Sequence, residues 1–297
     1  MNRRRFLGAV AVFAGGAYVS RAAGLTRQPS KTPSKHPTDN ETLNILLDRG
    51  EKEHLSGLAM GELVCFMGKA FLGSPYRAGT LECAGDEQLV VNVQQFDCMT
   101  FIETCLALAR TVKMHGRSPD AFRHELQLIR YRNGEIRGYP SRLHYFTEWV
   151  QDNAGKKIID DCTARLGGEP DRRALDFMSA HRLSYPPLAR EEFFAAMVAT
   201  EHQLSRGTRL FIPRSRVGET AAQLRSGDII GITTSTPGLD CSHTALAIRE
   251  RDELRLLHAP RPGTQVQISK ESLAVYLERS SRRTGILVAR PVDPSGL

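Results

Sequence analysis

The chain has 297 residues, of which 41% are hydrophobic and 25% are charged, a composition typical of a globular protein with a sizeable core. Its formal net charge of +7 comes from the start, because residues 1–40 hold seven of the 40 Lys and Arg but one of the 33 Asp and Glu. The remaining 33 basic and 32 acidic residues nearly balance. This part lacks the excess positive charge typical of nucleic-acid binding, so no nucleic-acid partner is expected.

The first 24 residues read MNRRRFLGAVAVFAGGAYVSRAAG, with a basic start, a short apolar stretch broken by glycine, and small residues near the end. This pattern is typical of an export signal and does not fit a membrane-spanning helix. Residues 3–7, RRRFL, also match the twin-arginine pattern R-R-x-F-L. We expect residues 1–22 to be a twin-arginine signal peptide that exports the protein to the periplasm. Membrane contact is expected only through this signal.

The rest of the chain changes from polar to helical and then to strand-rich. Residues 23–40 are rich in Pro, Ser, Thr and Lys, which predicts a disordered spacer before a domain over residues 41–297. Helices are expected within 41–72, a strand in LVVNV, and a mainly helical region over 118–206 with helices in AFRHELQLIRY, PSRLHYFTEWVQDN and REEFFAAMVATEHQL. From about residue 208, short alternating runs predict strands in RLFIP, DIIGITT, HTALAIR, LRLLHA, TQVQI and GILVARPV. Helices followed by strands favour an α+β fold.

Six cysteines occur with no C-x-x-C pair and no spacing typical of zinc ligands, at positions 65, 83, 98, 105, 162 and 241. No structural metal site is therefore predicted. Export would bring the cysteines into an oxidising compartment, where disulfides can form. If Cys98 stays free to react, an odd number remains and at least one further thiol is unpaired.

Cys98 lies where a helix is predicted to begin, in FDCMTFIETCLALARTVKMHG. Asp97 is a good N-cap, and Gly116 follows as a helix terminator. Between them, one helical face carries apolar or sulfur-containing residues at 98, 102, 105, 109 and 112. Cys98 is thus expected in the first turn, facing inward, where free N–H groups and the helix dipole stabilise a thiolate. One interpretation is a nucleophile; the alternative is a small buried side chain or half of a disulfide.

A nucleophilic thiol needs a base, and the last third of the chain offers two histidines in DCSHTALAIRERDELRLLHAP. His243 opens one predicted strand and His258 closes the next. In an antiparallel hairpin with an even-numbered loop, the two imidazoles share a face. A two-residue loop would place them directly opposite, and a four-residue loop would place His258 against Ala245; either register allows contact. The alternative is a pair of structural histidines.

Several words of the sequence together resemble a known family. The chain is similar to the NlpC-type cell-wall cysteine hydrolases, which are papain-like, in the motifs GSPYRAGTLE, FDCMTF, LRSGDII, GLDCSHTALAI and LLHAP. It more closely resembles the N-acetylmuramoyl-L-alanine amidase-like branch, over residues 45–292, in the motifs GTLE, FDCMTF, GYPSRLHYF and GLDCSH. The resemblance implies a papain-like core, in which a nucleophile helix packs on an antiparallel sheet, with 118–206 as a mainly helical insertion.

The resemblance also assigns roles to individual residues. It carries Cys98 over as the nucleophile, His243 as the base and His258 as the residue that orients the base. It places Tyr76 at the cleft near the cysteine; the alternative is an aromatic residue that packs in a turn. The common motif of the superfamily is D-C-S-G, whereas Met99 and Thr100 follow the cysteine here. This M-T pair is usual in the amidase-like branch.

Two further residues are candidates for substrate contact. In GYPSRLHYFTEWV, residues 143, 146 and 150 form the helical face that is expected in the core. Arg142 and His144 lie outside this face. Arg142 is the better candidate, because its guanidinium suits the carboxylates of a peptidoglycan stem peptide. Asp240, which lies close to His243 in the sequence, is the second candidate. The alternative for Arg142 is a solvated surface position.

The expected activity is that of a cysteine amidase that hydrolyses the N-acetylmuramoyl-L-alanine bond of peptidoglycan or muropeptides, without a cofactor. One alternative keeps the chemistry but cuts between D-Glu and the diamino acid, as an endopeptidase. Another is a peptidoglycan-binding module that has lost activity. A metal-dependent amidase is disfavoured, because the chain has no H-E-x-x-H word and no clustered ligands. The helical insertion favours the amidase, because it is expected to build a cleft wall that selects the bond.

The twin-arginine assignment predicts that replacing both Arg3 and Arg4 by Lys retains the precursor in the cytoplasm, because this export route reads the arginine pair. Cell fractionation with immunoblotting measures the share of protein that reaches the periplasm. Arg27→Lys, outside the motif, serves as the control and should be exported normally. Normal export of the double variant would indicate the general secretory route instead.

Overall fold

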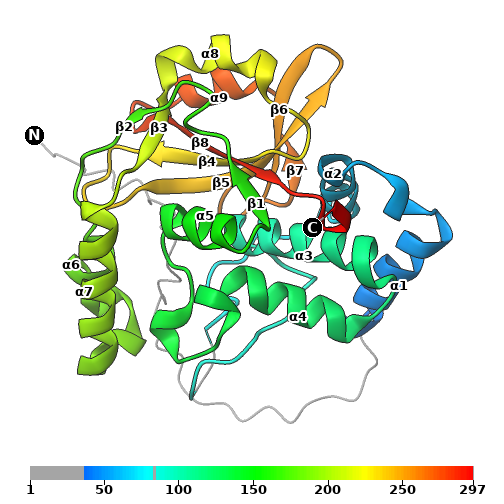
Figure 1. Cartoon of the computed structure of the whole chain (residues 1–297), viewed down its shortest axis with the longest axis horizontal. Coiled ribbons are helices and arrows are strands. Elements are labelled where there is room, and N and C mark those ends of the chain that lie inside the picture. Colours follow the sequence, from blue (N-terminus) through cyan, green and yellow to red (C-terminus); the bar gives the residue numbers. More distant parts are fainter. Residues whose placement is uncertain (1–36, 83–84, 297) are drawn as a thin grey trace, which may run out of the picture.

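Strands from the last third of the chain form an antiparallel sheet at the centre of the protein (Figure 1). In the computed structural model, which describes residues 37–82 and 85–296, the strand order is β2-β3-β8-β4-β5-β6-β7, and β1 pairs with β8. All pairings between these strands are antiparallel. The strands are β1 (Ile159–Asp161), β2 (Glu169–Pro170), β3 (Leu210–Pro213), β4 (Ile229–Thr234), β5 (Cys241–Glu250), β6 (Glu253–His258), β7 (Gln267–Ile268) and β8 (Arg283–Pro291).

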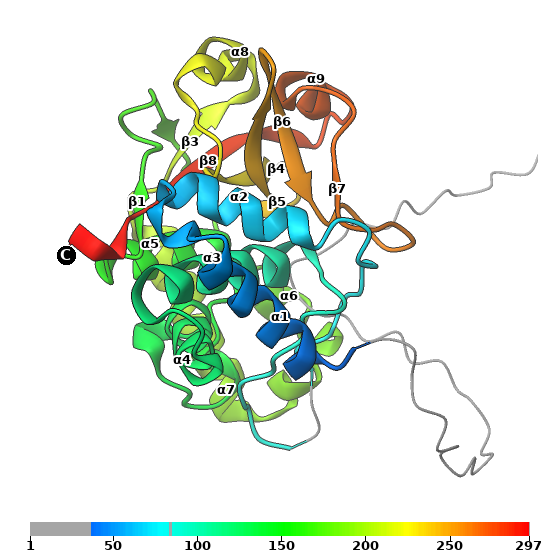
Figure 2. The same ribbon diagram turned by 90° about the vertical axis from the view of Figure 1, so that its right-hand side faces the viewer.

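Helices cover both faces of this sheet, so the α+β class expected from the sequence is confirmed. Figure 1 shows α8 and α9 on one side of the sheet and α3, α4 and α5 on the other, and Figure 2 shows α1 and α2 on the side of α3. The helices are α1 (Asp39–Lys52), α2 (Met60–Ala70), α3 (Cys98–His115), α4 (Pro119–Arg130), α5 (Phe146–Gly155), α6 (Phe177–Ala180), α7 (Glu191–Arg206), α8 (Val217–Thr220) and α9 (Leu273–Glu278).

Alternation along the strands sends apolar side chains into two separate cores. On β5, Leu246 and Ile248 join the core that includes residues of α2, α3 and α5. Ala245 and Ala247, which point the other way, join the core that includes residues of α8 and α9. Because both faces are covered, all six residues of the central strand β4 are buried. The strand that carries His243 is therefore held from both sides.

The region 118–206 contributes more than helices. It supplies α4, α5, α6 and α7, but β1 and β2 also lie within it and pair with β8 and β3. A third core gathers around α6 and α7, with Tyr145, Tyr185 and Met197 among its buried members. The region therefore packs as a layer beside the sheet and also extends the sheet.

Helix α3 begins and ends where the sequence predicts. Asp97 accepts hydrogen bonds from the backbone N–H groups of Met99 and Thr100, at 3.0 and 2.8 Å. The Thr100 hydroxyl returns a 3.0 Å bond by accepting from the Asp97 N–H, which completes a capping box. The helix ends before Gly116, whose φ of 62° suits glycine. The predicted inward face is buried, and so is most of the rest of the helix, because α2, α4 and the sheet surround it.

Two sequence predictions are wrong in detail. The segment LVVNV (89–93) is not a strand, because side chains satisfy its backbone: Asp39 accepts from the N–H of Val93, and Arg130 donates to the carbonyl of Val90. The helix expected to include Pro140 in its first turn begins only at Phe146. Residues 139–141 instead form an isolated 3₁₀ turn, and residues 142–145 run in a largely extended conformation to α5.

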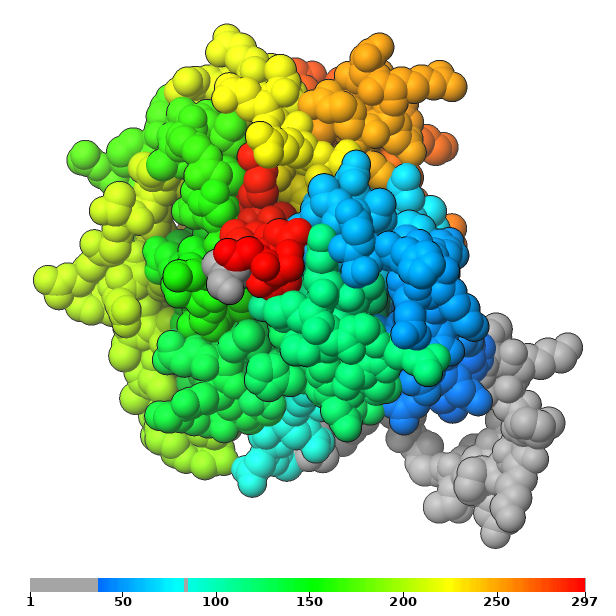
Figure 3. Space-filling view, turned by 45° about the vertical axis from the view of Figure 1, so that its right-hand side comes forward, coloured from blue at the N-terminus to red at the C-terminus, as the bar shows by residue number. Residues whose placement is uncertain are grey.

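The two ends of the described chain pack on the helical layer. Helix α1 starts at Asp39, inside the stretch assigned to the spacer, because Thr38 and Glu41 form a capping box. The predicted signal peptide lies outside the described residues. At the other end, Lys113 of α3 pairs with Asp293 at 2.8 Å, and Figure 3 shows this red C-terminal segment between the blue and green helices.

All five cysteines in the described part of the chain are free and buried: 65, 98, 105, 162 and 241. Cys83 lies outside the described residues, so nothing further follows for disulfide pairing. Within residues 37–82 and 85–296, no helix combines the length and the apolar character needed to cross a membrane.

The close packing of α5 on β4 gives a test of the fold. A side chain at Gly231 would overlap the ring of Phe146 and approach the Cys241 sulfur to 3.0 Å, so we expect Gly231→Ala to destabilise the protein by about 1–3 kcal/mol. Urea denaturation measures the free energy of unfolding. Gly218→Ala is the matched control, because nothing lies within 4 Å of its added Cβ. Equal stability of the two variants would contradict this packing.

Candidate active site

Cys98 lies in the first turn of α3 with 8% of its surface exposed. The hydroxyl of Thr244 on β5 donates a 2.9 Å hydrogen bond to the Cys98 carbonyl oxygen. Thr244 directly follows His243 along the strand. This bond therefore fixes the start of α3 beside the strand that carries the predicted base, although 146 residues separate the two bonded residues.

The β5–β6 hairpin brings the two predicted histidines together. Nε2 of His243 lies 2.8 Å from Nδ1 of His258, and the rings are only 6% and 1% exposed. Glu250 pairs with Glu253, so the turn has two residues, and the register continues with His258 opposite Ala245. The sequence analysis assigned this diagonal placement to a four-residue loop. In either case the two imidazoles lie on the same face of the sheet and contact each other directly.

Burial sets the protonation states of these groups. Burial, followed by the charge of the neighbouring Asp97 carboxylate, raises the pKa of the Cys98 thiol to about 12. Burial, followed by His258 and by the charge of Arg283, lowers the pKa of His243 well below its usual range. Burial and the charge of Arg283 together lower the pKa of His258 to about 4. The expected thiolate is therefore not favoured in this state, because desolvation outweighs the helix start. The site holds a neutral thiol and two neutral imidazoles.

The contact with His258 determines which nitrogen of His243 is available. Nε2 of His243 faces His258, so Nδ1 is the nitrogen left to accept a proton. Within the described residues, the Cys98 sulfur and the His243 ring form no hydrogen bond with each other. Catalytic hydrogen bonds often tighten only when substrate binds. The observed link between the two elements runs through the backbone, by the bond that Thr244 donates to the Cys98 carbonyl oxygen.

Tyr76 pairs with the segment that leads into the cysteine helix. The residue forms a bridge with Phe96, two positions before Cys98, and its N–H donates a 2.8 Å hydrogen bond to the Thr264 carbonyl. Burial raises the pKa of its hydroxyl, and the proximity of Cys98 adds to that increase. Its side chain is half-buried.

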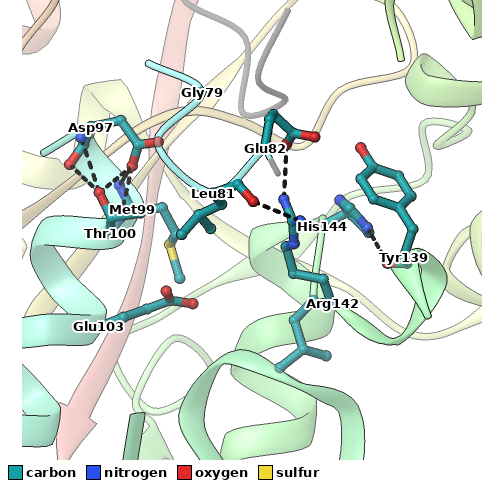
Figure 4. A pocket seen from close by; sticks show the side chains of 11 residues that line it. Gly79, Leu81, Glu82, Asp97, Met99, Thr100, Glu103, Tyr139, Arg142 and His144 are labelled. Atoms are coloured by element: carbon teal, nitrogen blue, oxygen red, sulfur yellow. Dashed lines mark hydrogen bonds and ion pairs between the residues drawn. The ribbon is translucent and has the colours of Figure 1, made fainter. Parts of the chain in front are cut away.

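A pocket opens beside the start of α3 (Figure 4). Its lining includes Met99 and Thr100 of α3, Leu81 from the preceding loop, and Tyr139 and Arg142 from the segment before α5. Three separate parts of the sequence therefore meet beside Met99 and Thr100. Cys98, His243 and His258 are not among the residues that line this pocket. The segment before α5 belongs to the region 118–206, which was expected to build a cleft wall.

Arg142 lies on the wall of this pocket and is fully engaged with carboxylates. It pairs with Glu82 at 2.9 Å and with Glu87 at 2.8 Å (Figure 4 shows the Glu82 pair). Burial alone lowers the pKa of Arg142, but the hydrogen bonds and charge of Glu87, together with Glu82, raise it overall. Glu87 is nearly buried, whereas 29% of the Glu82 side chain is exposed.

Asp240 is held inside the protein. One carboxylate oxygen accepts a 2.7 Å hydrogen bond from the N–H of Thr147 in the first turn of α5, and the other accepts from the N–H of Cys241 at 2.6 Å. Asp240 is 2% exposed, and burial raises its pKa. Its observed contacts tie α5 to β5, and we do not carry it into the proposed site.

His144 and the acidic groups of the pocket also have structural partners. The His144 ring contacts the Tyr139 carbonyl at 2.9 Å, and burial followed by the charge of Arg142 lowers its pKa to about 3. Glu103 pairs with Arg130 at 2.6 Å. No group of three or more His, Cys, Asp or Glu in the described part of the chain is arranged to hold a metal ion.

One known family matches most of the chain. The family described as AmiA-like, N-acetylmuramoyl-L-alanine amidase-like, matches residues 66–286, which include Tyr76 and all three predicted catalytic residues. The chain belongs to the AmiA-like family. None of the curated proteins matches the chain.

Solved structures resemble this AmiA-like protein over most of its length. An N-acetylmuramoyl-L-alanine amidase from Bacteroides uniformis ATCC 8492 is 36% identical, with a TM-score of 0.75, over 78% of this chain and 99% of that one. A Bacteroides fragilis protein that was named as a candidate xylanase is also 36% identical, with a TM-score of 0.72. The match covers 76% of this chain and 99% of that one. A Legionella pneumophila protein at 21% identity shares the fold, with a TM-score of 0.64 over 85% and 94%.

Sequence reasoning did not single out several residues that surround the site of this AmiA-like protein. Thr244, Tyr276 and Arg283 are among them, and so is Glu87. Thr244 stands beside His243 in the sequence, but nothing in its spacing indicates a bond to Cys98. Tyr276 and Arg283 reach the histidines only through the packing of α9 and β8.

The raised pKa of Cys98 predicts slow alkylation of the AmiA-like protein at neutral pH, because little thiolate is present. Mass spectrometry after timed exposure to iodoacetamide measures the rate at Cys98, and Cys98→Ser corrects for the other thiols. The rate should still rise with pH beyond 9.0, the ordinary pKa of a thiol. A plateau already reached at neutral pH would reveal a preformed thiolate and contradict this assignment.

Proposed function

We propose that this protein is a cysteine amidase of the NlpC-type, papain-like superfamily, which hydrolyses the N-acetylmuramoyl-L-alanine bond of peptidoglycan or muropeptides. Membership of the AmiA-like family implies an amidase-type hydrolase and a peptidoglycan-type substrate. The observation that carries the cysteine mechanism is the buried contact of His243 with His258, on a strand bonded to the backbone of Cys98.

In the first step, Nδ1 of His243 takes the proton of the Cys98 thiol as the sulfur attacks the amide carbonyl carbon. The carbonyl oxygen becomes an oxyanion, which the backbone N–H of Cys98 stabilises, because Asp97 already binds the N–H groups of Met99 and Thr100. His258 holds the imidazole of His243 through the 2.8 Å contact. A neutral imidazole beside a neutral thiol is the state that this step requires.

In the second step, protonated His243 donates its proton to the leaving nitrogen, and the C–N bond breaks. This releases the L-alanine amine and leaves a thioester on Cys98. Water then attacks the thioester, with His243 again accepting a proton, and the free thiol returns. These steps need no group beyond Cys98, His243, His258 and the backbone.

Tyr76 and Arg142 are the proposed substrate contacts. Tyr76 pairs with Phe96, two residues before Cys98, and can border the scissile bond. Arg142 can bind a carboxylate of the stem peptide if that carboxylate replaces Glu82, the exposed member of its pair. Glu87 is buried and would keep the guanidinium in place. Arg142 would thus exchange one carboxylate partner for another.

The similarity to a protein named after xylan does not lead us to propose glycoside hydrolysis. That reaction needs two available carboxyl groups on either side of a sugar bond. The acidic side chains that line the pocket are engaged: Asp97 caps α3, Glu103 pairs with Arg130, and Glu82 pairs with Arg142.

We also propose, from residues 1–22 of the sequence, that the enzyme acts in the periplasm after twin-arginine export.

Defined muropeptides decide both the reaction and the bond. We expect wild-type protein to release a disaccharide and a peptide that begins with L-Ala, which mass spectrometry identifies. Products that retain L-Ala-D-Glu on the sugar would establish the endopeptidase alternative. Binding without any product would establish the binding-module alternative.

Product analysis of defined muropeptides also tests the proposed catalytic residues. Cys98→Ala and His243→Ala should each reduce kcat on the order of a thousandfold or more, and His258→Gln should have a milder effect because an amide can still orient the base. Thermal unfolding of each variant separates loss of chemistry from loss of fold. Activity that survives Cys98→Ala but is abolished by a chelator would replace the cysteine mechanism with a metal-dependent one.

A further inference from the structure

Two side chains lie behind the histidine pair and take no part in the mechanism described above. Tyr276 of α9 contacts His258 edge to face, with ring centroids 5.5 Å apart and planes at 72°, and its centroid lies 6.3 Å from that of His243. The guanidinium carbon of Arg283, at the start of β8, lies 3.8 Å from the Tyr276 ring centroid. Arg283 also donates a hydrogen bond to the Tyr276 carbonyl.

His258 has one nitrogen with no hydrogen-bond partner. Its Nδ1 contacts His243, but its Nε2 is buried and unpaired within the described part of the chain. A neutral imidazole carries one proton, so this buried nitrogen presents either an N–H or a lone pair. Which of the two it presents depends on the direction of the hydrogen bond between the histidines.

Only one direction of the hydrogen bond between the two histidines allows His243 to act as a base. If His243 donates from Nε2 to Nδ1 of His258, then Nδ1 of His243 keeps its lone pair and can accept the Cys98 proton. His258 then presents an N–H at the unpaired position. In the opposite direction, His243 carries its proton on Nδ1 and cannot act as a base, while His258 presents a lone pair.

The electron-rich face of an aromatic ring distinguishes these two states. A ring face attracts an N–H and repels a lone pair, because its quadrupole is negative at the face. Tyr276 is the ring in edge-to-face contact with His258. We propose that Tyr276, held by Arg283, is a positioning residue whose ring accepts the Nε2–H of His258 and thereby selects the tautomer in which His243 can act as a base. This inference rests on the proposed cysteine mechanism.

Arg283 has a second effect on the same pair. Tyr276 on α9 contacts both imidazoles, and Arg283 on β8 is the charged group that acts on both. Its positive charge opposes protonation of both rings and lowers the pKa of each, after the larger effect of burial. Arg283 therefore helps to keep the base neutral while its contact with Tyr276 holds the ring in place.

The test compares a variant that removes the ring with one that keeps it. Tyr276→Leu should lower kcat about 10- to 100-fold with little change in KM, the range found for outer-shell partners that orient the histidine ligands of metal sites. Tyr276→Phe retains the ring face and should keep most of the activity. Val275→Ala, a partly exposed neighbour on α9, serves as the control for general effects on this helix.

Spectra of ¹⁵N-histidine-labelled protein report the tautomer directly. We expect both rings to be protonated on Nε2 in the wild type and in Tyr276→Phe, and a shift towards Nδ1 protonation in Tyr276→Leu. Signals are assigned by their loss in His243→Gln and His258→Gln. Because this readout needs no turnover, it tests the inference even if Cys98→Ala were to retain activity and the proposed function failed.

The pH profile gives an independent measurement. Arg283→Met should move the acid limb of kcat/KM to higher pH, because a base with a raised pKa stays protonated over a wider range. The inference is overturned if Tyr276→Leu keeps the wild-type tautomer and kcat. It is equally overturned if Tyr276→Phe, while folded, loses as much activity as Tyr276→Leu, because the hydroxyl rather than the ring would then be required.

Discussion

The hydrogen bond from the Thr244 hydroxyl to the Cys98 carbonyl joins the two halves of the candidate site. Cys98 comes from a helix in the first half of the chain, and the histidines come from a hairpin near its end. Helix α3 is surrounded by α2, α4 and the sheet, and β5 is covered on both faces. Close packing leaves neither element room to slide, so the thiol and the imidazoles keep a fixed relation.

The charged side chains between α3 and α4 are buried in pairs. Arg110 pairs with Glu125 and Arg130 with Glu103, both at 2.6 Å, and these buried pairs join α3 to α4. A buried charge is tolerated when a partner of opposite sign contacts it. Cys98 and His243 lie in a similarly dry environment without such a partner, so both are neutral. The neutrality of the site is therefore a consequence of its burial.

The segment before α5 connects the pocket wall to the base. It carries Arg142 and Tyr139 along the pocket, and α5 then begins with Thr147 bonded to the carboxylate of Asp240. Asp240 stands directly before β5, which carries His243. One buried carboxylate thus holds the wall and the histidine strand in register, and the region 118–206 is part of the same packed unit as the sheet through β1 and β2.

The sequence by itself determined what depends on neighbouring residues: the capped start of α3, its end at Gly116, the strands of the last third and the shared face of His243 and His258. Capping, helix termination and strand alternation are local properties, readable from residue type and spacing. Only the tertiary structure decided that LVVNV is satisfied by Asp39 and Arg130 instead of a strand partner, that Asp240 caps α5, and that Tyr276 and Arg283 reach the histidines. It also decided that Cys98 is a thiol, because the cost of desolvation depends on the complete packing around the sulfur and not on its place in the helix.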